Sequence, residues 1–370
     1  MKSPESSFEP IRVMVVDDSA IIRGLITKAL EKDSEISIVS SAFNGAIAID
    51  NIKKIQADII LLDIEMPEVD GLTALPKLLA LSPSSRIIMV SSITAHNAEA
   101  SIKAMQLGAS DYITKPTARN NQDDLERFYY ELIQKVKSLA LRRKKTDTAK
   151  EEVKVADVKA TSLPEIKPTL TPIIAYPKYP VKAIAIGCST GGPQALAKLF
   201  ADIASAKSIM QPIFITQHMP ATFTTILAKH IEQISGRKCV EGADGDIVKN
   251  GTIYVAPGDY HLTPMKENEN IVIRINKDPQ VNFCRPAVDP MFNALSAIYG
   301  SNLLAVILTG MGSDGLGGAK NVVKTGGTLI SQDENSSVVW GMPRAVAENK
   351  LSSAILPLDE IAPYIIRVCS

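Results

Sequence analysis

A serine at the end of an apolar segment is the first residue of this sequence whose position suggests catalysis. The segment Ile184–Ile186 runs into the small residues of Gly187–Gly192, which include Ser189, and a helical pattern follows from Gln194. A strand, a tight turn and a helix N-terminus would hold the hydroxyl where backbone N–H groups converge, as a serine nucleophile requires. Two other interpretations stay open, because glycine-rich turns are often only turns, and those before helices also bind phosphate.

A histidine and an aspartate follow two later apolar segments in the same way. His218 comes just after Pro212–Thr216, and Asp314 comes after Leu303–Leu308. If the three segments are strands of one parallel sheet, their carboxyl ends bring these side chains close to Ser189. A serine hydroxyl is a weak nucleophile at neutral pH, so a histidine must take its proton and a carboxylate must orient the imidazole. The pattern therefore predicts a triad of these three residues.

Other side chains compete for each of these roles. His261 is the strongest rival for the base, Asp333 is another available carboxylate, and Cys188 could be mistaken for the nucleophile. We interpret Cys188 as a small buried residue, as free cysteines usually are. Met311 lies among glycines that would let the backbone approach a reacting carbonyl. Its N–H, together with that of Thr190, is the predicted oxyanion hole.

A second group of polar residues follows the predicted strands of the first third of the chain. Asp17 and Asp18 come after the first strand, Asp63 after the third, Ser91 after the fourth and Lys115 after the fifth. The carboxylates would repel one another unless a cation lay among them, and oxygen ligands suit Mg²⁺. Because the lysine can stabilise added negative charge, the group predicts phosphoryl transfer onto a carboxylate. Alternatively, Asp17 and Asp18 only cap the following helix.

Alternating strands and helices must position both groups, and they predict an α/β protein. In residues 10–140, five strand–helix repeats indicate a parallel sheet covered on both faces. The expected strands there are Ile11–Val16, Ile36–Ala42, Asp58–Leu62, Arg86–Val90 and Ala109–Ile113. Residues 180–370 show the same alternation of strands and helices, which predicts a doubly wound α/β domain with a mostly parallel sheet. Within it, Thr252–Ala256 and Ile271–Ile275 could pair as an antiparallel hairpin.

Residues 141–179 are expected to form a flexible linker between these domains. They are charged, poor in aromatic residues and punctuated by prolines, so they cannot bury enough apolar area to fold alone. The alternative is a short amphipathic helix at Glu151–Ala160 within the segment.

Composition narrows the classes of partner. Lys+Arg and Asp+Glu are equal at 40 each, so net charge gives no attraction to nucleic acid or to a membrane surface. The N-terminal residues lack a signal-peptide core, and the sequence has no apolar run long enough to span a bilayer. Four cysteines without a C-x-x-C pair favour reduced thiols in a cytoplasmic protein. We expect a monomer, because no exposed heptad pattern is apparent.

The first domain resembles a two-component response-regulator receiver. The motifs that carry the resemblance are Val15–Ser19, Leu61–Pro67, Asp70-Gly71 and Lys115-Pro116. The resemblance implies a flavodoxin-like fold, Asp63 as phosphoacceptor, and Mg²⁺ bound by Asp17, Asp18 and Asp63. It also implies that Ser91 and Lys115 contact the phosphoryl group, and that a cis peptide bond precedes Pro116.

The second domain resembles the catalytic domain of the CheB family, the chemotaxis protein-glutamate methylesterases. The matching segments are Ile186–Gly192, Gln217–Pro220, Tyr254–Gly258, Arg285–Asp289, Leu308–Gly315 and Gly341–Pro343. The resemblance implies the triad Ser189, His218 and Asp314, and leaves His261 a structural or cleft-lining role. Two departures lie beside the expected cleft, Cys284 where a histidine is common and Ala287 where a serine is common. Arg285 could orient an acidic substrate or form a structural ion pair.

The resemblance also implies the function. It predicts hydrolysis of glutamate γ-methyl esters, and deamidation of glutamines, on the cytoplasmic helices of methyl-accepting chemoreceptors. A chemotaxis histidine kinase would be the phosphodonor, and we hypothesise that the unphosphorylated first domain covers the esterase site. The esterase would need no cofactor. One alternative is a non-enzymatic response regulator whose glycine-rich loops bind a phosphorylated ligand or partner. A serine peptidase is the remaining alternative, although no obvious strand is available to clasp a peptide.

Overall fold

The computed structural model describes residues 9–116, 125–140 and 175–370. The chain divides into two compact units, between Ser162 and Leu163, and each is described here by itself. Most of the predicted linker, including the possible helix at Glu151–Ala160, lies outside the described residues. Residues 175–179 are described and belong to the second unit, in which Tyr176 stacks on Tyr364 with ring centroids 5.3 Å apart.

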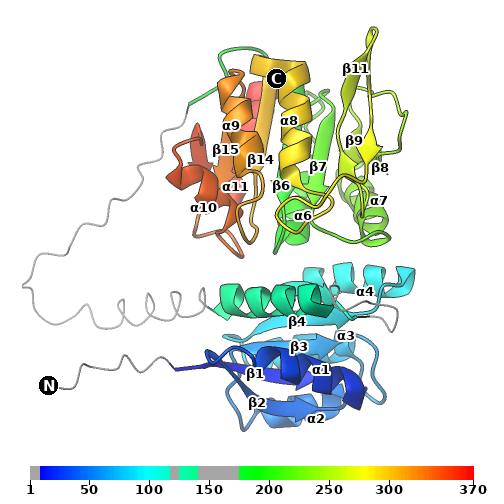
Figure 1. The fold of residues 1–370 in the computed structure, drawn as a ribbon, viewed down its shortest axis with the longest axis vertical. Helices are drawn as coiled ribbons and strands as arrows, with labels where there is room; N and C mark the ends of the chain where they lie inside the picture. The colour runs from blue at the N-terminus through cyan, green and yellow to red at the C-terminus, as the bar shows by residue number, and fades with distance from the viewer. Residues whose placement is uncertain (1–8, 117–124, 141–174) are drawn as a thin grey trace, which may run out of the picture. The chain divides into compact units, whose positions relative to one another are not determined.

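The first unit is a five-stranded parallel sheet with the order β2-β1-β3-β4-β5 (Figure 1). The strands are β1 (Ile11–Val16), β2 (Ile36–Ala42), β3 (Ile59–Asp63), β4 (Arg86–Ser91) and β5 (Asp111–Thr114). The helices are α1 (Ala20–Leu30), α2 (Gly45–Ile52), α3 (Gly71–Leu81), α4 (Ala95–Gln106) and a last one at residues 125–140. Strands β3 and β4 are apolar and almost entirely buried, as strands covered by helices on both faces must be. The sequence-based prediction of the receiver-type sheet is therefore confirmed.

Side chains at the carboxyl edge of this sheet begin its helices. Ser19, Asn44, Asp70 and Thr94 each accept a hydrogen bond from the backbone N–H three residues later, as N-caps do. The cap of α1 is thus Ser19, and neither Asp17 nor Asp18. The cis bond expected before Pro116 is wrong: within the described residues the only cis peptide bond joins Arg285 and Pro286. An X–Pro bond is trans unless its surroundings favour cis, so the proline alone did not decide it.

The second unit is built on a seven-stranded sheet with the order β16-β15-β14-β6-β7-β9-β8. Every neighbouring pair in this sheet is parallel. The strands are β6 (Ala183–Cys188), β7 (Ile213–Gln217), β8 (Cys239–Glu241), β9 (Ile253–Val255), β14 (Leu303–Ile307), β15 (Thr328–Gln332) and β16 (Ala354–Leu356). The helices are α6 (Gly192–Asp202), α7 (Phe223–Ser235), α8 (Val288–Tyr299), α9 (Leu316–Lys324), α10 (Met342–Glu348) and α11 (Leu358–Cys369), with a 3-10 turn at Gly300–Asn302. The expected doubly wound, mostly parallel architecture is confirmed.

Antiparallel hairpins are present, but the predicted pairing of Thr252–Ala256 with Ile271–Ile275 is wrong. Strand β9 lies inside the parallel sheet between β7 and β8. The hairpins form instead between β11 (Met265–Glu267) and β12 (Asn270–Val272), and between β10 (His261–Leu262) and β13 (Ile275–Asn276). All three residues of β9 are buried, as in a strand covered on both faces, whereas β11 is largely exposed.

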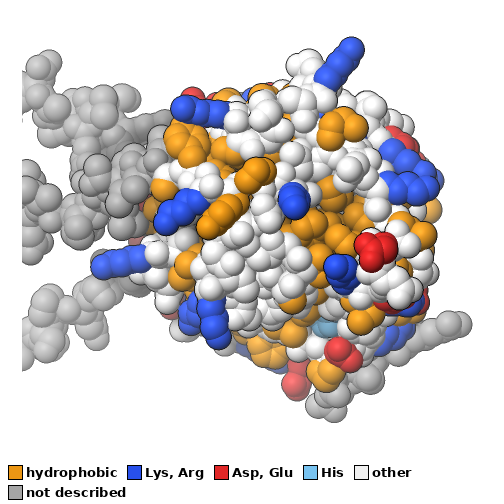
Figure 2. Space-filling view, turned by 90° about the horizontal axis from the view of Figure 1, so that it is seen from above, with side chains coloured by type: hydrophobic (Ala, Val, Ile, Leu, Met, Phe, Trp, Pro, Cys, Tyr) orange, Lys and Arg blue, Asp and Glu red, His pale blue; other side chains and the backbone are white. Residues whose placement is uncertain are grey.

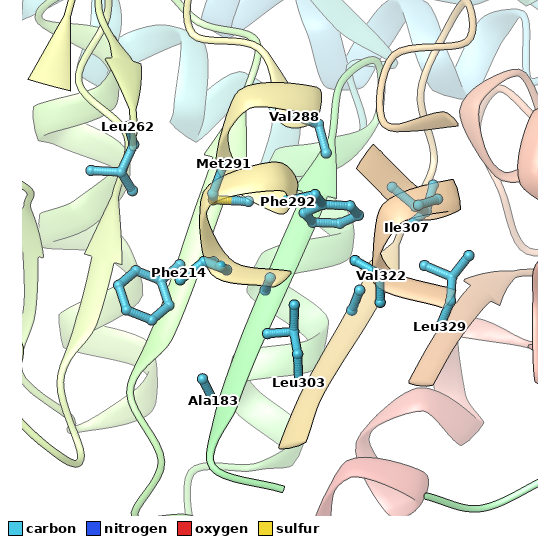
Figure 3. Close-up of a cluster of buried hydrophobic side chains, with 14 of the residues drawn as sticks. Ala183, Phe214, Leu262, Val288, Met291, Phe292, Leu303, Ile307, Val322 and Leu329 are labelled. Atoms are coloured by element: carbon cyan, nitrogen blue, oxygen red, sulfur yellow. The ribbon is translucent and has the colours of Figure 1, made fainter. Parts of the chain in front are cut away.

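Helix α8 packs its apolar side against the middle of the seven-stranded sheet. Figure 3 shows Val288, Met291 and Phe292 of α8 among buried side chains of the sheet, including Phe214 of β7 and Leu303 and Ile307 of β14. These side chains are fully buried, so the first turn of α8 is fixed relative to the ends of β6 and β14. That first turn contributes to the site described below.

No helix of the described residues is long and apolar enough to cross a membrane. Figure 2 shows one face of the molecule. Among the described residues of this face, Lys and Arg side chains are scattered and do not form one continuous patch. This agrees with the balanced composition.

Candidate active site and phosphoacceptor site

The three residues of the predicted triad lie at the carboxyl edge of the seven-stranded sheet. Ser189 directly follows β6, His218 directly follows β7, and Asp314 lies in the loop between β14 and α9. Strands β14, β6 and β7 are neighbours in the sheet. Residues far apart in the sequence are therefore gathered at one edge by the strand order, where open α/β sheets bind their ligands.

His218 and Asp314 are in direct contact. Nε2 of the imidazole lies 2.7 Å from Oδ2 of the carboxylate, within hydrogen-bond distance. Because Nε2 is engaged with Asp314, Nδ1 is the ring nitrogen left for another partner. The side chain of Cys284 lies close enough to the imidazole to influence its pKa.

The carboxylate of Asp314 is buried and surrounded by donors. It accepts hydrogen bonds from the N–H groups of Val288 at 2.6 Å, Asp289 at 3.2 Å and Gly315 at 2.8 Å. Two of these belong to the first turn of α8, so the positive end of that helix faces the carboxylate. Burial opposes ionisation, but His218 and these N–H groups outweigh it and lower the pKa of Asp314. Asp314 is thus held as an anion in a fixed orientation.

Charge around His218 favours its protonated form. Burial lowers the pKa of the imidazole, but Cys284 and Asp314 together outweigh that effect and raise it to about 10. These contacts therefore favour the imidazolium over the neutral imidazole. His218 becomes a general base only when it loses the imidazolium proton.

Ser189 is held by its main chain between the neighbouring strands. Its N–H donates to the carbonyl of Thr309 at 3.0 Å, and its carbonyl accepts from the N–H of Gly192 at 2.7 Å. On the other side, the N–H of His218 donates to the carbonyl of Cys188 at 3.3 Å. Within the part of the chain that the structure describes, the Ser189 hydroxyl makes no hydrogen bond, so it is not hydrogen-bonded to His218 in this structure. Such contacts commonly tighten only when substrate binds.

Glycine permits the close packing behind Ser189. A Cβ on Gly310 would lie 2.9 Å from Cβ of Ser189 and 2.4 Å from Sδ of Met342. The neighbouring N–H of Met311 has no acceptor in the described part of the chain, and neither does that of Thr190. Two unengaged N–H groups beside a serine are what an oxyanion hole requires.

The rival residues are engaged elsewhere. His261 is buried and uses both ring nitrogens, Nδ1 accepting from the N–H of Ala287 at 3.2 Å and Nε2 donating to the Pro279 carbonyl at 3.1 Å. Asp333 accepts from the N–H of Ser336 at 2.9 Å and so closes a local turn. Burial raises the pKa of the Cys188 thiol, which disfavours a thiolate nucleophile.

Arg285 and Ala287, which were predicted to lie beside the cleft, are both engaged in the structure of the domain itself. The guanidinium of Arg285 pairs with Asp259 at 2.6 Å and donates to the carbonyls of Lys277 and Asp278 at 3.1 Å each. These contacts match the structural ion pair, one of the two interpretations of Arg285. Ala287 is buried at the N-cap of α8 and supplies no side-chain cap.

The acidic residues of the first unit also converge. Carboxylate oxygens of Asp17, Asp18 and Asp63 lie within 4.8 Å of one another. The Lys115 ammonium lies 2.8 Å from Asp17 Oδ2 and 2.7 Å from Asp63 Oδ2. Burial, with the charge of Asp17, raises the pKa of Asp63 to about 6 despite Lys115. Three oxygen-only groups with excess negative charge, of which Asp17 and Asp63 are buried and Asp18 is exposed, fit a hard divalent cation such as Mg²⁺.

Ser91 ends β4 as predicted, but its hydroxyl is directed toward α4. It accepts a hydrogen bond from Ser101 Oγ at 3.0 Å and lies 3.3 Å from the carbonyl of Asn97. Contact with a phosphoryl group on Asp63 therefore requires this hydroxyl to rotate away from Ser101.

Comparison with known proteins identifies both units. Residues 184–365 match the family model for CheB methylesterase, and residues 13–125 match that for the response regulator receiver domain. A protein-glutamate methylesterase/protein-glutamine glutaminase of Azospirillum brasilense is 50% identical over 370 residues, covering 98% of this chain and 93% of that protein. The chain belongs to the CheB methylesterase family.

Other members of the CheB family agree. Protein-glutamate methylesterase/protein-glutamine glutaminase 1 of Rhodospirillum rubrum is 47% identical and covers 97% of this chain and 95% of its own length. The crystal structure of the Thermotoga maritima CheB methylesterase catalytic domain is 39% identical over 51% of this chain and all of that one, with a TM-score of 0.49. The family models and the full-length relatives confirm the resemblance inferred from the sequence, and they do not support the non-enzymatic alternative.

Two contacts of this CheB-family site were missed by reasoning from sequence. Cys284 was noted only as a departure from the family pattern, yet its side chain meets the imidazole of His218. Asn282 was not considered, and its Nδ2 lies 3.4 Å from Oδ1 of Asp314. Both belong to the tight turn Val281–Cys284, whose two middle residues have positive φ. A motif search cannot find them, because only the folded loop brings the turn to the triad.

Proposed function

We propose that this CheB-family chain hydrolyses glutamate γ-methyl esters, and deamidates glutamines, on the cytoplasmic helices of methyl-accepting chemoreceptors. Ser189 is the nucleophile, His218 the general base and Asp314 the residue that orients the imidazole. The observation that carries the proposal is the 2.7 Å contact between His218 and Asp314, one strand away from Ser189. The names of the relatives, which include both activities, support the same chemistry.

In the proposed acylation, Ser189 Oγ bonds to the ester carbonyl carbon while His218 takes the hydroxyl proton. The N–H groups of Thr190 and Met311 stabilise the negative carbonyl oxygen. The carbon–methoxy bond then breaks, and the leaving oxygen takes the proton from His218 to form methanol. Water adds to the acyl carbon as His218 takes one of its protons, and that proton returns to Ser189 Oγ as glutamate is released. A glutamine follows the same route with ammonia as the leaving group.

We propose that phosphorylation of Asp63 controls this activity, with a chemotaxis histidine kinase as the phosphodonor. Asp17, Asp18 and Asp63 would hold Mg²⁺, which neutralises charge on the transferred phosphoryl group when it is bound. The proposal is supported by the contact of Lys115 with Asp63 and by the shared location of the three carboxylates. Ser91 turns from Ser101 to reach the phosphoryl oxygens.

We further propose the regulatory arrangement predicted from the sequence. Residues 10–140 form the receiver, 141–179 the linker and 180–370 the catalytic domain of a cytoplasmic monomer. The unphosphorylated receiver covers the esterase site and phosphorylation shifts the population toward an open form. Deletion of residues 1–140 tests this: methanol release from receptor membranes should rise, and an unchanged rate contradicts inhibition by the receiver.

The triad is tested by Ser189→Ala in the full chain. Methanol release from methylated receptor membranes should fall by at least a thousand-fold on the scale seen for other triads, to roughly the level without enzyme. Phosphorylation of Asp63 should be unaffected. A serine-directed phosphonate should add mass to Ser189 of the unmodified chain alone, and substantial hydrolysis by Ser189→Ala would remove the assignment.

A further inference from the structure

One buried amide connects the two reacting residues of the proposed triad. Gln217 is the last residue of β7 and is 2% exposed. It precedes His218 in the sequence, and its side chain crosses to the neighbouring strand. There Nε2 donates to the carbonyl oxygen of Ser189 at 3.0 Å and lies 3.4 Å from the carbonyl of His218. A single side chain thus contacts the main chain of both residues.

The orientation of this amide is fixed by what it meets. A carbonyl oxygen only accepts hydrogen bonds, so the NH₂ group of Gln217 must face Ser189. The Ser189 carbonyl also accepts from the Gly192 N–H at 2.7 Å, which closes the turn after β6. With the Ser189 N–H donating to Thr309, both main-chain polar groups of the serine are occupied. Gln217 supplies the only one of these three contacts that comes from a side chain.

A glycine at position 192 leaves room for this amide. A Cβ on Gly192 would lie 1.9 Å from Oε1 of Gln217 and 3.1 Å from Cβ of Cys188. No side chain can occupy that position while the glutamine keeps its place. Gly192 and Gln217 are therefore matched in shape, although 25 positions separate them in the sequence.

We infer that Gln217 is a positioning residue for the Ser189 nucleophile, an inference that rests on the proposed function. Without its amide, the Ser189 carbonyl loses one of its two donors and the turn can shift relative to His218. A displacement of about 1 Å at a nucleophile can cost about a hundred-fold in rate. Because Gln217 does not touch the ester, substrate affinity should be little changed.

Gln217→Met tests the inference, since methionine keeps the length of the side chain and removes the donor. We expect kcat and the rate of phosphonate labelling at Ser189 to fall together, by roughly ten- to a hundred-fold, with KM changed less than two-fold. The matched control is Gln211→Met. Gln211 lies just before the same strand and likewise donates to two carbonyls, those of Val181 at 3.1 Å and Cys369 at 3.4 Å. It should lose stability similarly without losing kcat.

A second pair of variants separates shape from hydrogen bonding. Gly192→Ala alone should unfold at lower temperature, because its methyl group collides with Gln217. In the double variant Gly192→Ala, Gln217→Ala the collision is removed, so the melting temperature should recover while kcat stays low. Full kcat in the double variant or in Gln217→Met overturns the inference. If Ser189→Ala remains active, the proposed function fails instead, whatever the Gln217 variants do.

Discussion

Asp289 and Asp314 exchange contacts with each other's helices. Asp314, which precedes α9, accepts hydrogen bonds from the N-terminus of α8, and Asp289, which lies in α8, accepts one from the N-terminus of α9. Asp314, just before α9, accepts from Val288 and Asp289 in the first turn of α8. Asp289 in turn accepts from the N–H of Gly318 in the first turn of α9 at 2.6 Å. The positive ends of two helices therefore meet two carboxylates, which locks the loop that orients His218.

We predict that this exchange makes Asp289 important for stability and, through Asp314, for activity. Asp289→Ala removes an acceptor from the start of α9 and should cost about 1–2 kcal/mol of unfolding free energy. The position of Asp314 would then be less well defined, so kcat should also fall. Urea titration and methanol release measure the two effects.

The control is Asp289→Asn, which keeps an acceptor for Gly318. Burial, together with the charge of Asp314, raises the pKa of Asp289, so the neutral amide suits this position. Asn should retain most of the stability and activity. Equal losses in the Asn and Ala variants would show that charge, and not capping, is what Asp289 supplies.

We predict that Cys284 sets the pH dependence of the esterase. The thiol helps to raise the pKa of His218, and only neutral imidazole can accept the Ser189 proton. Activity should therefore rise with pH as the imidazolium deprotonates. In Cys284→Ala the pKa of His218 falls, so the rising limb of kcat/KM should move to lower pH.

The cysteine control for that experiment is Cys369→Ala. Cys369 is buried near the end of α11, so it should leave the pH profile in place. A Cys284→Ala profile that coincides with the unmodified one would mean that the thiol does not influence the imidazole in solution.

We predict that Asp63 destabilises the fold when it is ionised. Its pKa is about 6 in the folded chain, compared with an ordinary value of 3.8. The stability that its protonated form contributes is complete below about pH 4 and is lost as the pH rises through about 6. Asp63→Asn should thus stabilise by about 3 kcal/mol at pH 8, and by well under about 1 kcal/mol at pH 4.

Thermal unfolding of the full chain with a metal chelator, from pH 4 to pH 8, tests this. Asp70→Asn is a suitable control, because Asp70 is exposed and asparagine caps α3 equally well. If the gain from Asp63→Asn is the same at both ends of this range, the ionisation of Asp63 is not its source.

We predict that Gly310 cannot be replaced without loss of activity. Gly310→Ala places a methyl group against Ser189 and Met342, so the backbone behind the nucleophile must move. We expect a loss of about 1–3 kcal/mol in stability and at least a ten-fold lower kcat. Gly24→Ala, where a Cβ meets nothing within 4 Å, should instead stabilise α1 slightly. An active, stable Gly310→Ala chain would argue against close packing at Ser189.

Much of the fold could be predicted because the spacing of apolar residues along the sequence follows which side of each strand or helix is buried. The bounds of β1 and β2 agree with the prediction to the residue, and each strand that carries Asp63, Ser189 or His218 was identified. Short elements were missed, among them β8 and β16, because three residues give too little pattern. Strand β9 was assigned to the wrong partner, since an apolar run shows that a strand is buried but not which neighbour it joins.

By itself the sequence determined which residues stand at strand ends, since the alternation of apolar runs and polar turns is local. The family likeness then narrowed the candidates to Ser189, His218 and Asp314. Only the tertiary structure decided which of these touch: the 2.7 Å contact of His218 with Asp314, the amide of Gln217 on Ser189, and Cys284 at the imidazole. Such contacts depend on strand order and loop conformation. Both are fixed by packing among residues distant in the sequence, so they produce no periodic pattern that the sequence alone could reveal.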